Sequence, residues 1–305
     1  MKERDYYFQV ELLLQILPFL QQESCFSLKG GTAINLFFRE MPRLSVDIDL
    51  TYLPLHGREE SLQEINNCLK RIAEKITRSL PLVTIQQKTV RPNNLVNKLF
   101  IRRGEAIIKL EPNEILRGSV YLPKKIHLAK TVVEKFGMEF SILLNSFADV
   151  YAGKICAALD RQHPRDLFDI KILMEHEGIT KEIQRAFVIY LASHNRPIEE
   201  LLNPNLLDIQ DVFKTQFEGM SSLAVTCKEL EKVRIELISI LRSSLTEDER
   251  YFLLSIASDE PDWDRIEIEH VKDLPAIQWR LLNVQKMTLE KKKASVENLR
   301  SVLGL

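Results

Sequence analysis

The chain has 305 residues, of which 45% are hydrophobic and 28% are charged, and its net charge is −1. This composition is typical of a folded globular protein with about two domains and excludes a disordered chain. No apolar run reaches the ~18 residues that a membrane span needs, and no apolar segment follows the first basic residues as in a secretory signal. We therefore expect a cytoplasmic protein with no membrane partner.

The first predicted elements surround a pair of glycines. Residues 6–22 have apolar positions dense enough for a helix, which Pro18 should interrupt. Residues 26–29 then lead, as a strand or a turn, into the Gly-Gly-Thr sequence of residues 30–32, and helical spacing follows. Backbone N–H groups at such glycines can approach a phosphate, and a helix beginning near Thr32 would add its positive N-terminal end. Thr32 could cap that helix or bind a phosphate oxygen.

Residues 44–50 alternate with period two, which predicts a strand whose buried face carries Val46, Ile48 and Leu50. Asp47 and Asp49 must then share the opposite face. Two carboxylates this close repel each other unless a cation lies between them, and Mg²⁺ commonly takes one or two carboxylates together with phosphate oxygens. An isolated pair of this kind is more often two surface aspartates. The order of two glycines, a helix and then this strand, all within twenty residues, is a more specific indication of a phosphate and metal site than the aspartate pair alone.

A charged amphipathic helix is predicted at residues 59–80, followed by a strand at 82–90 and a hairpin that turns at 102–105. In the last strand of the hairpin, Lys109 and Glu111 fall on one face. The charged residues from position 88 to position 104 are all basic, namely Lys88, Arg91, Lys98, Arg102 and Arg103. Such a patch could bind a polyphosphate or an RNA backbone, or be an ordinary solvated hairpin.

The second half of the sequence reads as helical. A helix at 147–161 is broken by His163-Pro164, and another begins with Arg165-Asp166. Further helical segments are predicted at 181–194, 208–217, 226–244, 247–257 and 277–303. The whole pattern predicts an α/β or α+β first half and a helical second half. Four scattered cysteines (Cys25, Cys68, Cys156 and Cys227) contain no CxxC pair, which argues against a zinc ribbon or a disulfide framework.

Two stretches carry a resemblance to a known family. The segment LKGGTAINLFFREMPRLSVDIDLTY resembles motif I of the polymerase-β nucleotidyltransferase superfamily, and more narrowly that of the AbiEii/AbiGii toxins of bacterial toxin–antitoxin pairs. The segment ADVYAGKICAALDRQHPRDLFDIKIL carries a second match, and EPDWDRIEIEHVKDLPAIQWRLLN a weaker third. With the pattern, the resemblance implies an α+β protein that has a polymerase-β-type nucleotidyltransferase domain with a mixed sheet at 1–145. It also implies a helical domain at 146–305 that contributes a Lys/Asp side to the active-site cleft.

Residue by residue, the resemblance implies that Lys29, Gly30, Gly31 and Thr32 hold the triphosphate of an NTP. It implies that Asp47 and Asp49 are catalytic and bind Mg²⁺ or Mn²⁺, with Glu111 as the third metal carboxylate.

In the second stretch, Lys154 and Asp166 would be catalytic, and Lys154, Arg165 and Asp169 would bind the nucleotide. Asp166 would lie near the nucleotide or the acceptor hydroxyl and is a candidate base. Residue spacing alone also allows an ordinary helix lysine at Lys154 and a surface ion pair between Arg165 and Asp169.

The implied reaction is attack of an acceptor hydroxyl on the α-phosphate of an NTP, with release of pyrophosphate. The family suggests an RNA acceptor, with the tRNA 3′ end foremost, and a cognate antitoxin protein as partner. Three alternatives stay open at this point: transfer of NMP to a protein side chain, a non-catalytic NTP-binding protein, and a metal-dependent nuclease.

Overall fold

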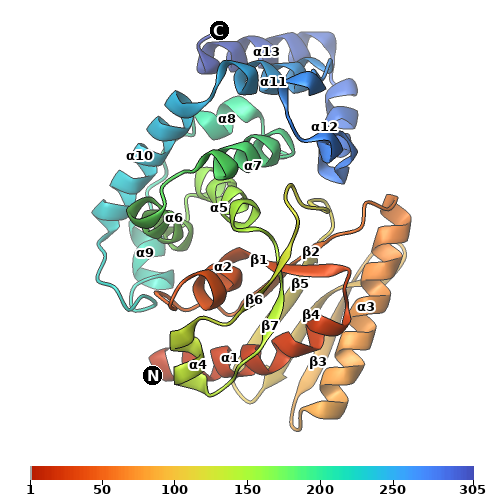
Figure 1. The fold of residues 1–305 in the computed structure, drawn as a ribbon, viewed down its shortest axis with the longest axis vertical. Coiled ribbons are helices and arrows are strands. Elements are labelled where there is room, and N and C mark those ends of the chain that lie inside the picture. The colour runs from red at the N-terminus through yellow and green to blue at the C-terminus, as the bar shows by residue number, and fades with distance from the viewer. Residues whose placement is uncertain (1) are drawn as a thin grey trace. The chain divides into compact units, whose positions relative to one another are not determined.

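The computed structural model describes residues 2–305, with side chains from residue 6 onward. The chain folds into two compact units: the residues up to Ser146 together with Gly219–Leu223, and Phe147–Glu218 together with Ala224–Leu305 (Figure 1). None of the helices between residues 2 and 305 combines the length and the apolar character that crossing a bilayer requires.

The first unit is built on a seven-stranded mixed sheet with the strand order β3-β4-β5-β2-β1-β7-β6. The strands are β1 (Phe26–Lys29), β2 (Asp47–Tyr52), β3 (Thr84–Val90), β4 (Leu95–Arg103), β5 (Ala106–Asn113), β6 (Lys124–His127) and β7 (Ser141–Leu144). The pairs β5–β2 and β1–β7 are parallel, and all other neighbours are antiparallel. The mixed sheet, the α+β class and the hairpin were therefore predicted correctly.

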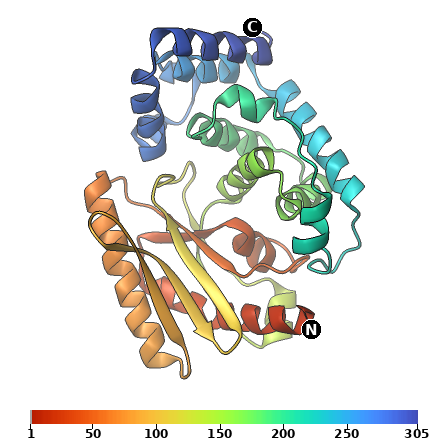
Figure 2. The ribbon, with the colours of Figure 1, turned by 180° about the vertical axis from the view of Figure 1, so that it is seen from behind.

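Helices cover one face of this sheet. The helical segments of the unit are α1 (Lys2–Ile16), the 3₁₀ turn η1 (Leu17–Gln22), α2 (Gly30–Ala33), the π-helical turn η2 (Ile34–Phe38), α3 (Arg58–Ser79) and α4 (Lys130–Phe136). α1 packs against β5 and α3 against β4, and the two views in Figures 1 and 2 agree on this. Ile48, Leu50, Leu99, Ile108 and Leu110 are fully buried beneath them. Burial of each such side chain contributes roughly 1.5–3 kcal/mol.

Alternation then places the charged residues of β2 and β5 on the other face. Along β5, buried residues alternate regularly with half-buried ones, so Lys109 and Glu111 point away from α1 and α3. Asp47 and Asp49 do the same on β2. The predicted opposition of apolar and acidic faces is confirmed, with one difference: the strand begins at Asp47, and Val46 before it is only half-buried.

A short segment from the second half of the sequence belongs to the first unit. The backbone N–H of Leu44 donates to the carbonyl of Met220, and that of Ser222 donates to the carbonyl of Pro42. Arg43 and Ser221 form an isolated antiparallel bridge between these hydrogen bonds. This pairing fixes the loop that precedes β2, and nothing in the sequence pattern indicated it.

The second unit is helical, as predicted. Its helices are α5 (Phe147–Arg161), α6 (Pro164–His176), α7 (Lys181–Ala192), α8 (Ile198–Leu202), α9 (Gln210–Gln216), α10 (Cys227–Ser244), α11 (Glu247–Ser258), α12 (Pro275–Gln285) and α13 (Leu289–Leu303), with 3₁₀ turns η3 (Trp263–Arg265) and η4 (Glu269–Asp273). The break at His163-Pro164 is confirmed, since His163 is the N-cap of α6. The single helix predicted over 277–303 was wrong: Thr288 caps a new helix through its side chain, so the segment forms two helices.

Candidate active site

Strand register brings charged residues from five strands into one row. Lys29 on β1 is in register with Asp49 on β2, and Asp49 with Glu111 on β5. Beyond β5, Lys98 on β4 contacts Glu111, and Lys88 on the edge strand β3 is in register with Lys98. Neighbouring strands lie ~4.8 Å apart and registered side chains share a face. Across the sheet, the row therefore contains two lysines, then two carboxylates, then one lysine; in order these are Lys88, Lys98, Glu111, Asp49 and Lys29.

The Glu111 carboxylate is held by two lysines. Lys98 Nζ lies 2.7 Å from Glu111 Oε1, and Lys109 Nζ lies 3.2 Å from Glu111 Oε2. Partial burial raises the pKa of Glu111, but hydrogen bonds and charge from both lysines outweigh that effect and hold the pKa below its ordinary value.

The lysines nearest the aspartates respond in opposite ways. Burial lowers the pKa of Lys109, but the charges of Asp47, Asp49 and Glu111 outweigh burial and raise it overall. For Lys29, burial dominates over the attraction of Asp49 and Glu111, so its pKa lies below the ordinary lysine value. Of the two lysines, Lys109 is therefore the one whose charged form is stabilised by Asp47 and Asp49.

The two glycines allow close approach of side chains to the turn between β1 and α2. Gly30 has φ of +73°, and a Cβ added there would lie 2.7 Å from Asp49 Oδ2. A Cβ on Gly31 would lie 2.8 Å from both Arg43 Nη2 and Ser45 Oγ. A side chain at either position would displace these groups, and Gly30 is also favoured by its positive φ.

Replacing Gly30 with alanine should remove activity through the position of Asp49 as well as through backbone strain. Gly104 is the matched control, because it also has positive φ, at +58°, yet has nothing within 4 Å of its added Cβ. Each substitution should lower the free energy of unfolding by about 1 kcal/mol or somewhat more, measured in urea. Only Gly30→Ala should lose the nucleotide transfer that the resemblance implies, and equal activity of the two variants would contradict the assignment.

Thr32 holds the strand of the aspartates. The residue at the N-cap of α2 is Lys29, which makes no side-chain cap, so the helix begins at Gly30 and the predicted capping role of Thr32 was wrong. Its hydroxyl donates to the backbone carbonyl of Asp47 and lies 3.2 Å from Ser45 Oγ. Thr32 is 1% exposed. The contact fixes the start of β2 against the glycine turn.

The donor set of this face fits a hard divalent cation. Asp47 and Asp49 offer carboxylate oxygens from one strand face, as Mg²⁺ prefers, and leave room for phosphate oxygens and water. The predicted third ligand Glu111 is adjacent to Asp49 but is engaged by Lys98 and Lys109. In the described part of the chain, the carboxylate oxygens of Asp47, Asp49 and Glu111 do not all lie within 4.8 Å of one another. The metal would therefore be held first by the aspartates, and Glu111 would join by releasing a lysine.

A separate charged cluster lies inside the second unit. Lys154 Nζ lies 2.7 Å from Asp166 Oδ1 and 3.1 Å from Asp169 Oδ2, and all three side chains are at most 6% exposed. The guanidinium of Arg161 donates to both oxygens of Asp166. Lys154 and Arg161 lie on α5, and the two aspartates lie on α6, so the cluster joins these helices.

This geometry corrects two expectations. Asp169 pairs with Lys154, and Arg165 forms no ion pair with the side chains of residues 6–305, so the surface Arg165–Asp169 pair that spacing allowed does not form. Burial raises the pKa of Asp166, but Lys154 and Arg161 outweigh burial and hold the pKa far below its ordinary value. A carboxylate with both oxygens engaged and a depressed pKa is a poor proton acceptor. The candidate base role of Asp166 is therefore not supported.

The small residues around Lys154 serve helix packing. A Cβ added to Gly153 would lie 3.3 Å from Cε1 of Tyr190 on α7, and Ala152 and Ala158 are fully buried. The close approach that these residues predicted is therefore that of a neighbouring helix.

A cavity of about 410 Å³ in the first unit lies apart from the aspartates. Tyr7, Arg43, Phe136 and Met220 are among its lining residues, whereas Asp47 and Asp49 are not. Arg43 lines this cavity, and its guanidinium also lies close to Gly31 of the glycine turn. None of the described residues that line it is acidic, so the cavity offers no carboxylate to a cation. The aspartate face of the sheet is therefore the candidate site.

Comparisons with known proteins identify a family. Residues 11–283 match the family described as nucleotidyl transferase AbiEii toxin, type IV toxin–antitoxin system. Among solved structures, the chain is similar to MenT4, a nucleotidyltransferase toxin from Mycobacterium tuberculosis H37Rv, with a TM-score of 0.63 and 15% sequence identity. That similarity covers 92% of this chain and 93% of the other, and at this identity it establishes a shared fold. The search of curated proteins gave no match.

Proposed function

Because this chain belongs to the AbiEii family and is therefore a nucleotidyltransferase toxin of a type IV toxin–antitoxin system, we propose that it transfers NMP from an NTP to an RNA acceptor, foremost the tRNA 3′ end. The reaction depends on Mg²⁺, which Mn²⁺ can replace, and releases pyrophosphate. The observation that carries this proposal is the acidic face of β2, where Asp47 and Asp49 lie beside the Gly30 turn and among lysines.

In the proposed reaction, the acceptor oxygen forms a bond to the α-phosphorus, and the bond from that phosphorus to the bridging oxygen of pyrophosphate breaks. Asp47 and Asp49 would hold Mg²⁺, which would supply electrostatic stabilisation to oxygens on which negative charge develops. The backbone of Gly30 and Gly31 approaches the phosphates, and Lys29 and Lys109 neutralise their charge. The chain thus contributes positioning and electrostatics, which dominate phosphoryl transfer.

The lysines of β3 and β4 support an RNA acceptor. Lys88 lies on the exposed edge strand in register with Lys98, which reaches Glu111 beside Asp49. A phosphate backbone that followed this row would lead a strand from the edge of the sheet to the aspartates. The predicted nucleotide contacts of Lys154, Arg165 and Asp169 stay predictions.

The test is incorporation of each of the four α-³²P-labelled NTPs into total tRNA by the wild-type protein. With Mg²⁺, label from at least one NTP should join the RNA, and RNase should remove it while protease leaves it. Excess EDTA should abolish labelling, and added Mg²⁺ should restore it, because the aspartates require a cation to act.

The same assay separates the alternatives. Label that resists RNase and is removed by protease would identify a protein acceptor. Shortening of the RNA without any NTP would identify a nuclease. NTP binding without incorporation into RNA or protein would overturn the catalytic proposal.

A further inference from the structure

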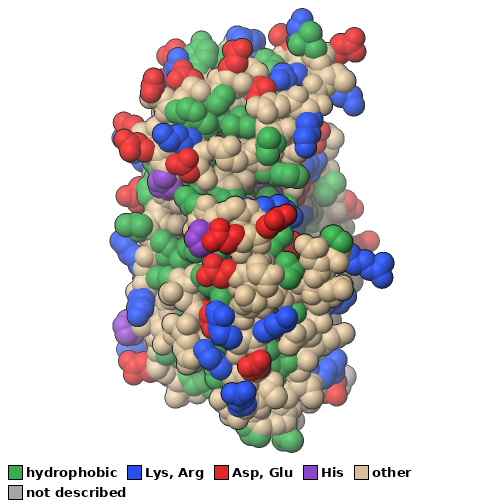
Figure 3. Space-filling model, turned by 90° about the vertical axis from the view of Figure 1, so that its right-hand side faces the viewer, with side chains coloured by type: hydrophobic (Ala, Val, Ile, Leu, Met, Phe, Trp, Pro, Cys, Tyr) green, Lys and Arg blue, Asp and Glu red, His purple; other side chains and the backbone are tan. Residues whose placement is uncertain are grey.

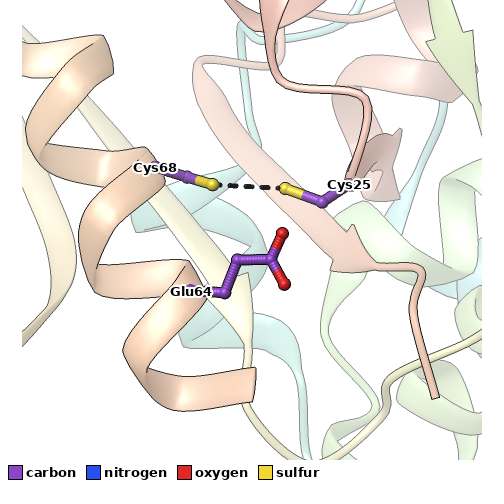
Figure 4. Close-up of side chains that lie close together, drawn as sticks. All are labelled: Cys25, Glu64 and Cys68. Carbon is purple, nitrogen blue, oxygen red and sulfur yellow. Dashed lines mark hydrogen bonds between the residues drawn. The ribbon is translucent and has the colours of Figure 1, made fainter. Parts of the chain in front are cut away.

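Two cysteine thiols meet in the first unit, away from the aspartates. Cys25 immediately precedes β1 and Cys68 lies on α3, and their Sγ atoms are 3.3 Å apart. Both thiols are buried, Cys25 at 8% and Cys68 at 1% exposure. Figure 4 shows the Glu64 side chain, one helical turn before Cys68, extending from α3 toward Cys25. Residues distant in sequence therefore form a dithiol with a carboxylate beside it.

The two sulfurs have different surroundings. Arg71 Nη2 lies 3.0 Å from Cys68 Sγ, while the same guanidinium forms a bidentate pair with Glu23. The hydrogen bond to Cys68, burial and the nearby negative charges of Cys68, Glu64 and Glu23 all raise the pKa of Cys25. Cys25 therefore keeps its proton, while a fixed positive charge faces the sulfur of Cys68. The guanidinium is therefore placed to stabilise negative charge on the Cys68 sulfur when that sulfur attacks an electrophile.

This arrangement fits a disulfide better than a metal site. Two thiolates on a tetrahedral Zn²⁺ with Zn–S bonds of ~2.3 Å lie about 3.8 Å apart, and structural zinc takes four protein ligands. Within residues 2–305 only Cys25, Glu64 and Cys68 group this closely, and the sulfurs are nearer than zinc would hold them. A cation would also meet the guanidinium of Arg71. Formation of a disulfide needs no fourth ligand and no added positive charge.

We propose that Cys25 and Cys68 are a site of reversible oxidation by a hydroperoxide. The Cys68 thiolate attacks the peroxide, forms an S–O bond and releases the alcohol or water after protonation of the leaving oxygen. The Cys25 sulfur then attacks the sulfenic sulfur of Cys68 and forms the S–S bond. The S–O bond breaks in this step, and Glu64 can relay the proton of Cys25 to the hydroxyl of the sulfenic acid, which leaves as water.

The product would link α3 covalently to the residue before β1, across 43 positions of sequence. Beside the thiols, the side chains of Arg71 and Glu64 on α3 are 51% and 38% exposed. Basic and acidic side chains are interspersed over the face of the molecule on which α3 lies (Figure 3). An oxidant must pass these charged side chains to reach buried sulfurs, which favours a small neutral peroxide over a bulky charged disulfide.

The experiment treats the full-length, reduced protein with hydrogen peroxide in EDTA, blocks free thiols with N-ethylmaleimide under denaturing conditions, and measures intact mass. Two of the four thiols should be lost together, with a mass decrease of two hydrogen atoms before blocking. Peptide mapping should identify Cys25 linked to Cys68, and dithiothreitol should restore both thiols. The oxidised protein should also unfold at a higher temperature, because the cross-link restricts the unfolded chain.

Matched variants make the test specific. Cys25→Ser should lose the cross-link, whereas Cys227→Ser should retain it. Arg71→Gln should slow cross-linking several-fold, while Arg78→Gln, on the exposed side of the same helix, should leave the rate unchanged.

Other products would overturn the proposal. These are oxygen addition without loss of paired thiols, links through Cys156 or Cys227, and four thiols that stay reactive after prolonged oxidation. Stoichiometric zinc that stays bound to wild type through dialysis, and not to Cys25→Ser, would assign a metal site instead.

Discussion

Asp49→Asn should lower the rate of NMP transfer by ~10³-fold or more while leaving the fold intact. The amide has the same shape as the carboxylate, so it fits beside Gly30 where an added Cβ would lie 2.7 Å from Asp49 Oδ2. It lacks the charge that a divalent cation needs. Removal of this negative charge also leaves Lys29 and Lys109 with less compensation, which weakens the geometry of the row.

Single-turnover transfer from labelled NTP to tRNA measures this effect, with thermal unfolding as the check on folding. Asp211→Asn is the matched control, because Asp211 is exposed in the first turn of α9 and has no role in the proposed reaction. Its activity should equal that of wild type. If Asp49→Asn retained more than about a tenth of wild-type activity, the metal would have to bind elsewhere.

Local patterns made the aspartates and the glycines predictable. Period-two alternation places Asp47 and Asp49 on one face whatever the sheet around them. A glycine pair directly before a helix indicates a turn that needs backbone freedom or close approach, and Gly30 has both. The structure bears out the alternation through the complete burial of Ile48 and Leu50.

The partners of these residues were not predictable, because they depend on strand order. Lys98 reaches Glu111 only because β4 pairs with β5, and Glu111 reaches Asp49 only because β5 lies parallel to β2. The same register turns the basic run of the hairpin into separate groups: Lys98 joins the row, whereas Arg103 packs against Gln15 of α1. The number of basic residues along the sequence does not show that they separate into these groups.

In the second unit, spacing suggested the wrong pair. Arg165 and Asp169 are four residues apart on one helix, which is the usual spacing of a surface ion pair. Asp169 is 1% exposed, however, and a buried carboxylate requires a partner from the protein interior, which Lys154 supplies from the neighbouring helix. Burial, which the sequence did not reveal, decided the pairing.

Lys154→Met should lower the free energy of unfolding by about 3–5 kcal/mol. The substitution leaves Asp166 and Asp169 buried, at most 2% exposed, and removes the ammonium group that pairs with both of them, while Arg161, which pairs with Asp166, is 62% exposed. Lys171→Met is the control, since Lys171 forms an i,i+4 pair with the half-exposed Glu175 on the same helix, and such a pair contributes about 0.2–0.5 kcal/mol. Urea unfolding at neutral pH compares the two. Equal stability of Lys154→Met and wild type would contradict a structural role for this cluster.

The loss should depend on pH in a defined direction. Lys154 and Arg161 hold the folded-state pKa of Asp166 below its ordinary value, so wild type gains stability above the unfolded pKa of ~3.9 and loses it as pH falls toward the lower folded value. Removal of Lys154 raises that folded-state pKa, so the variant has less of this stability to lose in acid. The difference in unfolding free energy between wild type and Lys154→Met should therefore narrow from pH 7 to about pH 3. A difference that stays constant over this range would mean that Lys154 stabilises the helices by packing alone.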